Sequence, residues 1–402
     1  MDRVPAAKLP GSETMNSTLV ATVIIAAGVG SGVLLCPVPW SPALLGIAAA
    51  FGCWTWGRGT DTVRIIAANC TAIFIALAVF ESYLGTQNAF DDGTRLEGTI
   101  IEGFTHPDDE LGYAPDPGSQ VTARKMHGNE VVYDVVYTID QDGRRVTPAA
   151  KGNGSPACLL LFGDSVTFGE GVNDEETFSF RVGQLLHEEY QVSNLAFSGY
   201  GPHQMLSVLE AGRVVPDANC SSRRFVYLAI PEHIARVAGL TSWDRHGPRY
   251  RLGSGGSAIR DGNFDDPPEL FGAAVPTWLV AAFDNYHTCR RFFGRTRDPG
   301  QLDQALFLAV IRKAAAELQR RFPGSDFSVL FWDARDDSRI ATVETDLNAA
   351  GIPMYRVTEA IPDLLPDLER YVISKHDQHP NPLQHQLIAE FMVRRMLGSE
   401  LH

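Results

Sequence analysis

Hydrophobic residues dominate the first 84 positions of this 402-residue chain, where they form three segments separated by short polar or proline-containing breaks. No charged residue occurs between positions 14 and 57. Crossing the hydrocarbon core of a membrane takes about 20 predominantly apolar residues in a helix. We therefore predict three transmembrane helices at residues 17–35, 41–56 and 63–84, so that residues 1–87 form a membrane region.

Basic residues set the expected orientation of these helices. Arg3 and Lys8 precede the first one, Arg58 and Arg64 lie between the second and the third, and the intervening loop at 36–41 has none. The positive-inside rule then places the N-terminus in the cytoplasm and everything after the third helix outside it. A signal peptide is one alternative, although no small-residue cleavage site stands out. A single anchor followed by two buried helices is another.

The hydrophobic pattern changes to short alternation after the membrane region. Residues 131–139 alternate as a strand does, and residues 141–144 have the composition of a turn. We predict that residues 88–151 form a small β-rich extension packed beside the next domain. A plain spacer is the alternative.

Apolar runs and amphipathic segments alternate through residues 152–402. Four short apolar runs predict buried strands at residues 158–162, 225–230, 327–332 and 353–357. Four longer segments with helical spacing predict helices at residues 176–190, 302–322, 336–350 and 383–397. Such alternation predicts an α/β/α domain with a parallel sheet between two helix layers. Residues 242–299 show little regular pattern, which predicts a lid or binding loop, with a disordered segment as the alternative.

The charge of the chain narrows the possible partners. The formal net charge is −14, and the four basic and four acidic residues before position 83 cancel, so the excess lies on the remainder. An acidic domain of this kind argues against nucleic acid as a partner, because nucleic-acid binding needs basic patches. It also argues against adherence of this domain to an anionic lipid surface.

The cysteines and the search for metal-binding motifs give little information about function. Cys158, Cys220 and Cys289 lie outside the membrane region. We expect Cys158, at the start of a core strand, to be buried and unreactive, and Cys220 and Cys289 are the pair that could form a disulfide. The sequence holds no Cys-x-x-Cys and no His-Glu-x-x-His. We therefore expect no metal site and no cofactor.

The segment Gly-Asp-Ser-Val-Thr-Phe-Gly at 163–169 carries the first candidate for chemistry. It joins a predicted strand to a predicted helix, and such a turn can lift the hydroxyl of Ser165 to the C-terminal edge of a parallel sheet, where open α/β folds bind ligands. A hydroxyl is a weak nucleophile and needs a base. The sequence is not an α/β-hydrolase elbow, because Thr167 stands where Gly-x-Ser-x-Gly requires glycine.

A candidate base lies near the C-terminus, where Asp377 and His379 precede the last predicted helix. A histidine beside an aspartate can accept a serine proton while the carboxylate orients the ring. Asp377 and His379 are only two positions apart, so one loop can present both. His376 is an alternative base.

These segments, with Asn-Leu-Ala-Phe-Ser-Gly at 194–199, resemble the SGNH/GDSL hydrolase superfamily over residues 157–397. The resemblance implies that Ser165 is the nucleophile, that Gly199 supplies an oxyanion-hole amide, and that His379 and Asp377 are base and orienting acid. The Asp-x-His spacing is similar to that of the branch with polysaccharide O-acetylation proteins and O-acetyl esterases.

One block of that family is missing. The third block normally supplies an asparagine to the oxyanion hole, whereas this chain has Pro-Glu-His-Ile-Ala-Arg at 231–236, and His233 is the donor we suggest in its place. The loss of one oxyanion donor typically lowers the rate by about two to three orders of magnitude.

The predicted membrane region and the resemblance together predict a membrane-anchored extracytoplasmic serine esterase. Its expected partners are the lipid bilayer and an O-acylated, in particular O-acetylated, glycan or small ester. Two alternatives remain open. The first is an O-acetyltransferase that acts on exported polysaccharide with an acyl-donor membrane partner. The second is a glycan-binding protein without catalytic activity that keeps the fold.

Overall fold

The computed structural model describes residues 69, 93–152, 154–214, 220–266, 269–270, 273–274, 298–335 and 337–399. The three predicted transmembrane helices therefore lie outside the described residues, apart from Asn69. Within the described part, no helix combines the length and the hydropathy needed to cross a membrane. One unit of the chain, Asp92–Pro268 with Arg295–His402, holds nearly all of the described structure. The other contributes the antiparallel pair β11 (Glu269–Leu270) and β12 (Ala273–Ala274).

A five-stranded parallel sheet forms the centre of the larger unit, in the order β14-β13-β8-β6-β7. Its strands are β6 (Ala157–Phe162), β7 (Tyr190–Asn194), β8 (Arg223–Ala229), β13 (Asp326–Phe331) and β14 (Met354–Arg356). Strand order departs from chain order, so helices must cross over the sheet between strands. The prediction of an α/β fold with a parallel sheet is confirmed.

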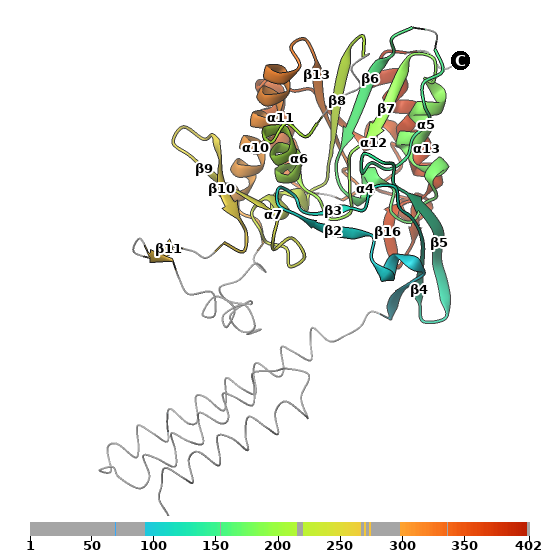
Figure 1. Ribbon diagram of the computed structural model, residues 1–402, viewed down its shortest axis with the longest axis horizontal. Coiled ribbons are helices and arrows are strands. Elements are labelled where there is room, and N and C mark those ends of the chain that lie inside the picture. Colours follow the sequence, from blue (N-terminus) through green and yellow to red (C-terminus); the bar gives the residue numbers. More distant parts are fainter. Residues whose placement is uncertain are drawn as a thin grey trace, which may run out of the picture. The chain divides into compact units, whose positions relative to one another are not determined.

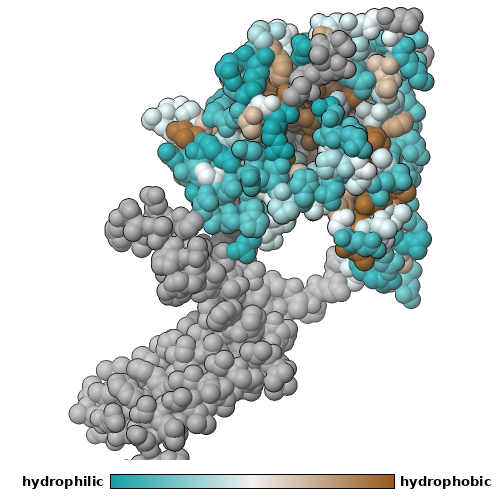
Figure 2. Space-filling view, in the orientation of Figure 1, coloured by the Kyte–Doolittle hydropathy of each residue, from teal (hydrophilic) through white to brown (hydrophobic). Residues whose placement is uncertain are grey.

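Helices cover both faces of this sheet (Figure 1). One layer contains α6 (Pro202–Glu210), α7 (His233–Val237), α10 (Gln301–Arg321) and α11 (Arg339–Ala349). The other contains α5 (Phe178–Leu185), α12 (Val357–Ala360) and α13 (Pro382–Phe391), which a π-helical turn, η4 (Met392–Met396), continues. Strand residues feed the two cores alternately, as Leu160 and Leu161 do, because successive side chains of a strand point to opposite faces. On the side seen in Figure 2, the outer surface is mainly hydrophilic.

The residues before β6 form two small antiparallel sheets. One has the order β1-β4-β5, from β1 (Thr94–Glu97), β4 (Gln120–His127) and β5 (Glu130–Thr138), and the other pairs β2 (Thr105–Asp108) with β3 (Gly112–Pro115). A single-turn 3₁₀ helix, η1 (Thr99–Glu102), follows β1, and two others, η2 (Asp174–Glu176) and η3 (Leu368–Arg370), lie farther along the chain. We call residues 94–138 the β-extension.

Aromatic side chains join the β-extension to the loops at the C-terminal edge of the central sheet. Phe104 and Tyr137 of the β-extension share a buried cluster with Phe168 and Phe197. The ring centroids of Phe104 and Phe197 are 5.3 Å apart, as are those of Tyr137 and Phe168. Phe168 and Phe197 lie in the two segments singled out in the sequence, so packing against the β-extension helps to position both.

The prediction that residues 242–299 lack regular structure is wrong for their first part. Strands β9 (Pro248–Leu252) and β10 (Ala258–Asn263) form an antiparallel hairpin, with the glycine-rich stretch 253–257 as its turn. Charged residues on both strands hid the pattern, although Tyr250 and Ala258 are buried in the core. Residues 275–297 lie outside the described part.

The disulfide expected from Cys220 also has a different partner. Cys158 and Cys220 are bonded, with Cα atoms 5.4 Å apart. Cys158 is buried as expected, but it pairs with Cys220 because β6 and β8 are neighbouring strands. Cys158 lies opposite Arg223, the first residue of β8, and Cys220 is three positions before it. Cys289, the partner suggested by the sequence, lies outside the described residues.

Candidate active site

Ser165 lies at the C-terminal edge of the sheet, at the first position of a single helical turn, α4 (Ser165–Phe168), that follows β6. Gly163 precedes it with φ +155°, and a Cβ there would lie 2.2 Å from Thr167 Oγ1. Asp164 caps the turn by accepting a hydrogen bond from the Val166 amide at 3.1 Å. The Gly-Asp-Ser sequence therefore has a local structural reason: only glycine fits before the turn, and the aspartate satisfies its first amide.

The structure brings Ser165 together with both predicted partners. His379 Nε2 lies 2.9 Å from Ser165 Oγ, and His379 Nδ1 lies 2.6 Å from Asp377 Oδ1. Asp377 and His379 belong to β16 (Asp377–Pro380), which pairs with β15 (Val372–Ser374). Residues two apart on a strand face the same side, which explains how Asp-x-His presents both groups to one serine. The alternative base, His376, instead stacks on His127 with ring centroids 3.5 Å apart.

Charged neighbours set the protonation of this pair. Burial alone would raise the pKa of Asp377, but the hydrogen bond with His379 and the ammonium group of Lys125 hold that pKa below its usual range. The Lys125 Nζ atom lies 3.0 Å from Asp377 Oδ2. Burial alone would lower the pKa of His379, whereas the negative charges of Glu170 and Asp377 raise it to about 9. At neutral pH the imidazolium form of His379 is therefore favoured.

Gly199 occupies a second tight turn, with φ +83°. A Cβ at this position would lie 2.4 Å from the Tyr113 hydroxyl and 2.9 Å from Trp243 Nε1, so no other residue fits without displacement. Tyr113, from the β-extension, donates to the Ser198 carbonyl at 2.7 Å, and the Trp243 indole donates to the Gly199 carbonyl at 3.3 Å. Within the described part of the chain, the amides of Ser165 and Gly199 donate to no protein acceptor, which leaves both for a ligand.

The suggestion that His233 supplies an oxyanion donor is corrected by its position. The ring is fully buried, with Nδ1 2.6 Å from the Tyr227 hydroxyl and Nε2 3.3 Å from Asp164 Oδ2. Both nitrogens thus face buried protein groups and neither is left for a substrate. His233 and Arg236 instead flank Asp164, which has no solvent exposure. Burial alone would raise the pKa of Asp164, but these two neighbours lower it well below the ordinary value.

Arg236 links the two turns of the site. Its Nη1 atom donates to Asp164 Oδ2 at 2.8 Å and to the Tyr200 carbonyl at 2.7 Å. Asp164 directly precedes Ser165, and Tyr200 directly follows Gly199. One buried guanidinium therefore sets the separation of the Ser165 turn and the Gly199 turn.

Sequence reasoning missed Glu170 and Lys125. Glu170 Oε2 lies 4.0 Å from His379 Nε2 and accepts a hydrogen bond from Ser198 Oγ at 2.8 Å. A signal for Glu170 was present, because it follows Gly169 at the end of the Ser165 turn. None was present for Lys125, which lies 252 positions from Asp377 in the chain.

A cleft of about 470 Å³ adjoins Gly199 and Glu170. This volume lies within the range of small-molecule sites. Aromatic side chains form much of its wall, namely Phe104, Tyr113, Tyr133, Tyr137, Phe197 and Trp243. Trp243 is 55% exposed and so presents its ring to solvent.

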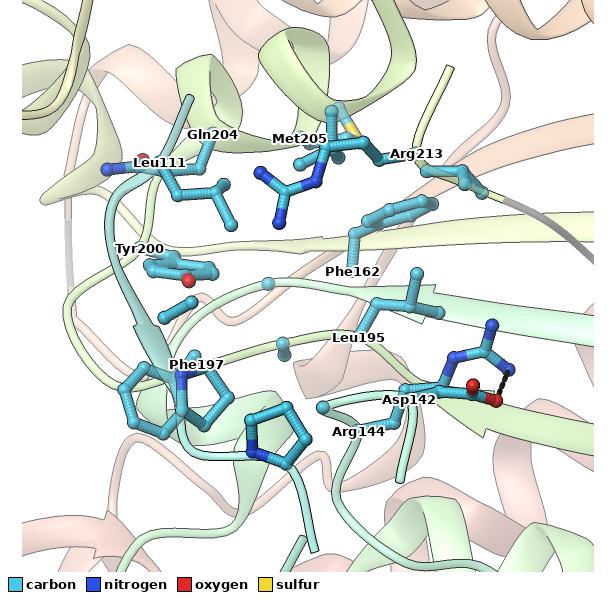
Figure 3. Close-up of a pocket in the computed structure, with 18 of the residues that line it drawn as sticks. Leu111, Asp142, Arg144, Phe162, Leu195, Phe197, Tyr200, Gln204, Met205 and Arg213 are labelled. Atoms are coloured by element: carbon cyan, nitrogen blue, oxygen red, sulfur yellow. Dashed lines mark ion pairs between the residues drawn. The ribbon is translucent and has the colours of Figure 1, made fainter. Parts of the chain in front are cut away.

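A second cavity, of about 180 Å³, is separate from the candidate active site. Figure 3 shows Tyr200, Gln204 and Arg213 around it, with the ion pair of Asp142 and Arg144 at one side. Ser165, Asp377 and His379 do not line it. In the described part of the chain, no group of three or more histidine, cysteine, aspartate or glutamate residues could hold a metal ion.

No protein-family model and no curated protein matches the sequence. Solved structures do resemble the chain. A lipolytic protein of the G-D-S-L family from Veillonella parvula has 12% identity and a TM-score of 0.35, with 60% of this chain and 98% of that chain covered. An acetyl xylan esterase from Geobacillus stearothermophilus has 13% identity and a TM-score of 0.34, with 62% and 98% covered. A family two carbohydrate esterase from Cellvibrio japonicus has 12% identity and a TM-score of 0.29, with 77% of this chain and 97% of that chain covered. Likenesses this remote carry no activity over to this chain.

Proposed function

We propose that this protein is a serine ester hydrolase of the SGNH/GDSL type. The observation that carries the proposal is the unbroken series of contacts from Ser165 Oγ through His379 to Asp377, at 2.9 and 2.6 Å. Nucleophile, base and orienting acid are within hydrogen-bond distance of one another, which is the geometry that nucleophilic acyl transfer needs.

In the proposed reaction, Ser165 Oγ bonds to the ester carbonyl carbon while His379 Nε2 takes its proton. The amides of Ser165 and Gly199 stabilise the oxyanion. The tetrahedral intermediate then releases the alcohol, which takes the proton from His379, and leaves an acyl group on Ser165. Water attacks that acyl group, His379 takes a proton from the water, and the carboxylic acid leaves as Ser165 regains its proton.

We propose an O-acetylated glycan as the substrate. The resemblance of the Asp377-x-His379 segment to O-acetyl esterases supports this choice, and so does the aromatic wall of the neighbouring cleft. Incubating the full-length protein with O-acetylated xylan should release acetate, and a fluorophosphonate should label the protein on the peptide that contains Ser165. Release without labelling at Ser165 would refute the proposed nucleophile. Labelling without release from any acetylated glycan would refute the substrate.

We also propose that three transmembrane helices anchor the protein and hold the esterase domain outside the cytoplasm. The uncharged N-terminal segments and the placement of Arg3, Lys8, Arg58 and Arg64 support this arrangement. The Cys158–Cys220 disulfide fits an oxidising compartment. Externally added protease should digest the domain in intact cells, whereas a cytoplasmic domain would be protected.

The pH dependence of hydrolysis should reflect the raised pKa of His379. Only neutral histidine can accept the Ser165 proton, and a pKa of about 9 in place of 6.5 means that the neutral form appears at higher pH. We therefore expect kcat/KM for a neutral ester to rise with pH and to reach half of its plateau near pH 9. Rates between about pH 6 and 10 would measure this. A midpoint below 7 would show that Glu170 and Asp377 do not act on His379 as proposed.

Lys125 should influence catalysis from the β-extension. Replacing it by methionine keeps the aliphatic stem but removes the ammonium group 3.0 Å from Asp377. We expect kcat to fall by about tenfold with little change in KM, because one hydrogen bond to a charged group is lost. Lys125→Arg should restore most of the rate. The control is Arg124→Met on the same strand, whose ion pair with Asp134 is half exposed; equal loss in both variants would point to general damage to β4.

A further inference from the structure

Glu170 is a carboxylate beside the triad that the proposed mechanism does not use. Its Oε2 atom lies 4.0 Å from His379 Nε2, the nitrogen that faces Ser165. The backbone holds it there, because the Glu170 amide donates to the Ser165 carbonyl at 2.9 Å. Among the described residues no lysine or arginine forms an ion pair with Glu170, and about a quarter of its side chain is exposed.

The position of this carboxylate relates it to the alcohol part of a substrate. His379 Nε2 is the atom that returns the proton to the departing alcohol oxygen, so that oxygen must come within hydrogen-bond distance of Nε2. A group 4.0 Å from Nε2 is close enough to reach the atoms next to the ester oxygen. Glu170 stabilises the imidazolium that His379 becomes in the first step, but its charge also repels the developing oxyanion unless a substrate donor neutralises part of it.

The surroundings of Glu170 fit a polyhydroxylated ligand. Glu170, Ser198 and Gly199 line the 470 Å³ cleft, and Tyr113 and Trp243 add aromatic surface to its lining. Aromatic rings contact the apolar face of a ring-shaped ligand, while a carboxylate accepts hydrogen bonds from its hydroxyls. The Ser198 hydroxyl already donates a hydrogen bond to Glu170 Oε2 at 2.8 Å. A substrate hydroxyl would be a donor of the same kind.

Resting on the proposed esterase function, we propose that Glu170 is a specificity-determining residue that accepts a hydrogen bond from a hydroxyl next to the ester oxygen. The preferred substrates are then esters of polyols with a free neighbouring hydroxyl, such as a sugar ring that is only partly acetylated. Fully acylated and anionic alcohols are disfavoured, since the first lack the donor and the second are repelled.

Two small esters test this directly in the full-length protein. 2-Hydroxyethyl acetate carries the neighbouring hydroxyl, and 2-methoxyethyl acetate carries a methoxy group that cannot donate. We expect kcat/KM to favour the hydroxy ester by about tenfold or more, the discrimination typical of a hydrogen bond to a charged group. Glu170→Ala should bring the ratio close to one, and Glu170→Gln should leave a smaller preference, because an amide oxygen is a weaker acceptor. The ratio is independent of any change in the His379 pKa, since both esters share that base.

Ser198→Ala is the matched control, because it removes the hydroxyl that contacts Glu170 and keeps the carboxylate; its preference should stay near that of the unchanged protein. A ratio near one in the unchanged protein, or a preference that survives in Glu170→Ala, would overturn the assignment. The failure of the proposed function looks different: neither these esters nor 4-nitrophenyl acetate would then be hydrolysed in a Ser165-dependent way. Glu170→Gln, nearly identical in shape, keeps the test valid if Glu170→Ala does not fold.

Discussion

Replacing Ser165 by alanine should lower kcat/KM for 4-nitrophenyl acetate by about 10⁴-fold or more. The expected loss is this large because no other group in the arrangement can take over the attack. Ser165 Oγ is the atom that His379 Nε2 contacts at 2.9 Å, and without it His379 has no proton to accept. The fold should be preserved, since alanine only deletes one oxygen from a nearly buried side chain.

Ser193→Ala is the control for this experiment. Ser193 lies on β7 and its hydroxyl accepts from Arg144 at 3.3 Å, so it contacts none of the three triad residues. Its activity should equal that of the unchanged protein. The Ser165→Ala variant also separates catalysis from recognition, because it should still bind an O-acetylated glycan in a binding assay. Undiminished hydrolysis by Ser165→Ala would end the esterase proposal, and glycan binding without any hydrolysis by the unchanged protein would favour a binding role.

Replacing Arg236 by methionine should destabilise the domain by about 3–5 kcal/mol, the usual cost of removing one partner from a buried ion pair. Arg236 is nearly buried and Asp164 fully so. After the replacement, His233 is the basic side chain that remains beside Asp164 among the described residues, and burial lowers its pKa, which favours the neutral ring. The free energy of unfolding, measured with urea, would report the effect. Arg320→Met removes a largely exposed guanidinium from its ion pair with Glu317 and should lower the free energy of unfolding far less.

The loss caused by Arg236→Met should depend on pH. The pKa of Asp164 is lowered in the folded protein, so its ion pair stabilises the fold above the unfolded-state value of 3.8 and that contribution is lost as pH falls through the folded value. The difference in the free energy of unfolding between the unchanged protein and Arg236→Met should thus be largest near neutral pH. It should become smaller toward pH 4 and below. The double variant Asp164→Asn with Arg236→Met should recover part of the stability. A gap that is constant with pH would mean that packing, rather than charge, explains the loss.

A structural feature could be predicted from the sequence where the residues that cause it are close together in the chain. The Gly163-Asp164-Ser165 turn was identified because its glycine, its capping carboxylate and the strand before it are all adjacent in the chain. The same holds for Asp377 and His379, since a spacing of two places both on one side of a strand. The parallel sheet followed from alternating apolar runs and amphipathic helices.

Other features depend on contacts between distant positions, and no local pattern reports them. The order of β6 and β8 in the sheet brings Cys158 to Cys220 rather than to Cys289. The fold places His233, at the start of α7, 3.3 Å from Asp164, a residue 69 positions earlier in the chain, and the ring is fully buried there.

The identity of the proposed reacting groups could therefore be predicted from the sequence itself, because a turn, a cap and a strand spacing are short-range properties of the chain. The environment of those groups was decided only by the tertiary structure. Lys125 approaches Asp377, and Glu170 approaches His379, through the docking of the β-extension and the closure of two loops on one sheet edge. Electrostatic interactions act through space and not along the chain, so the pKa of His379 and the proposed choice of substrate follow from the fold.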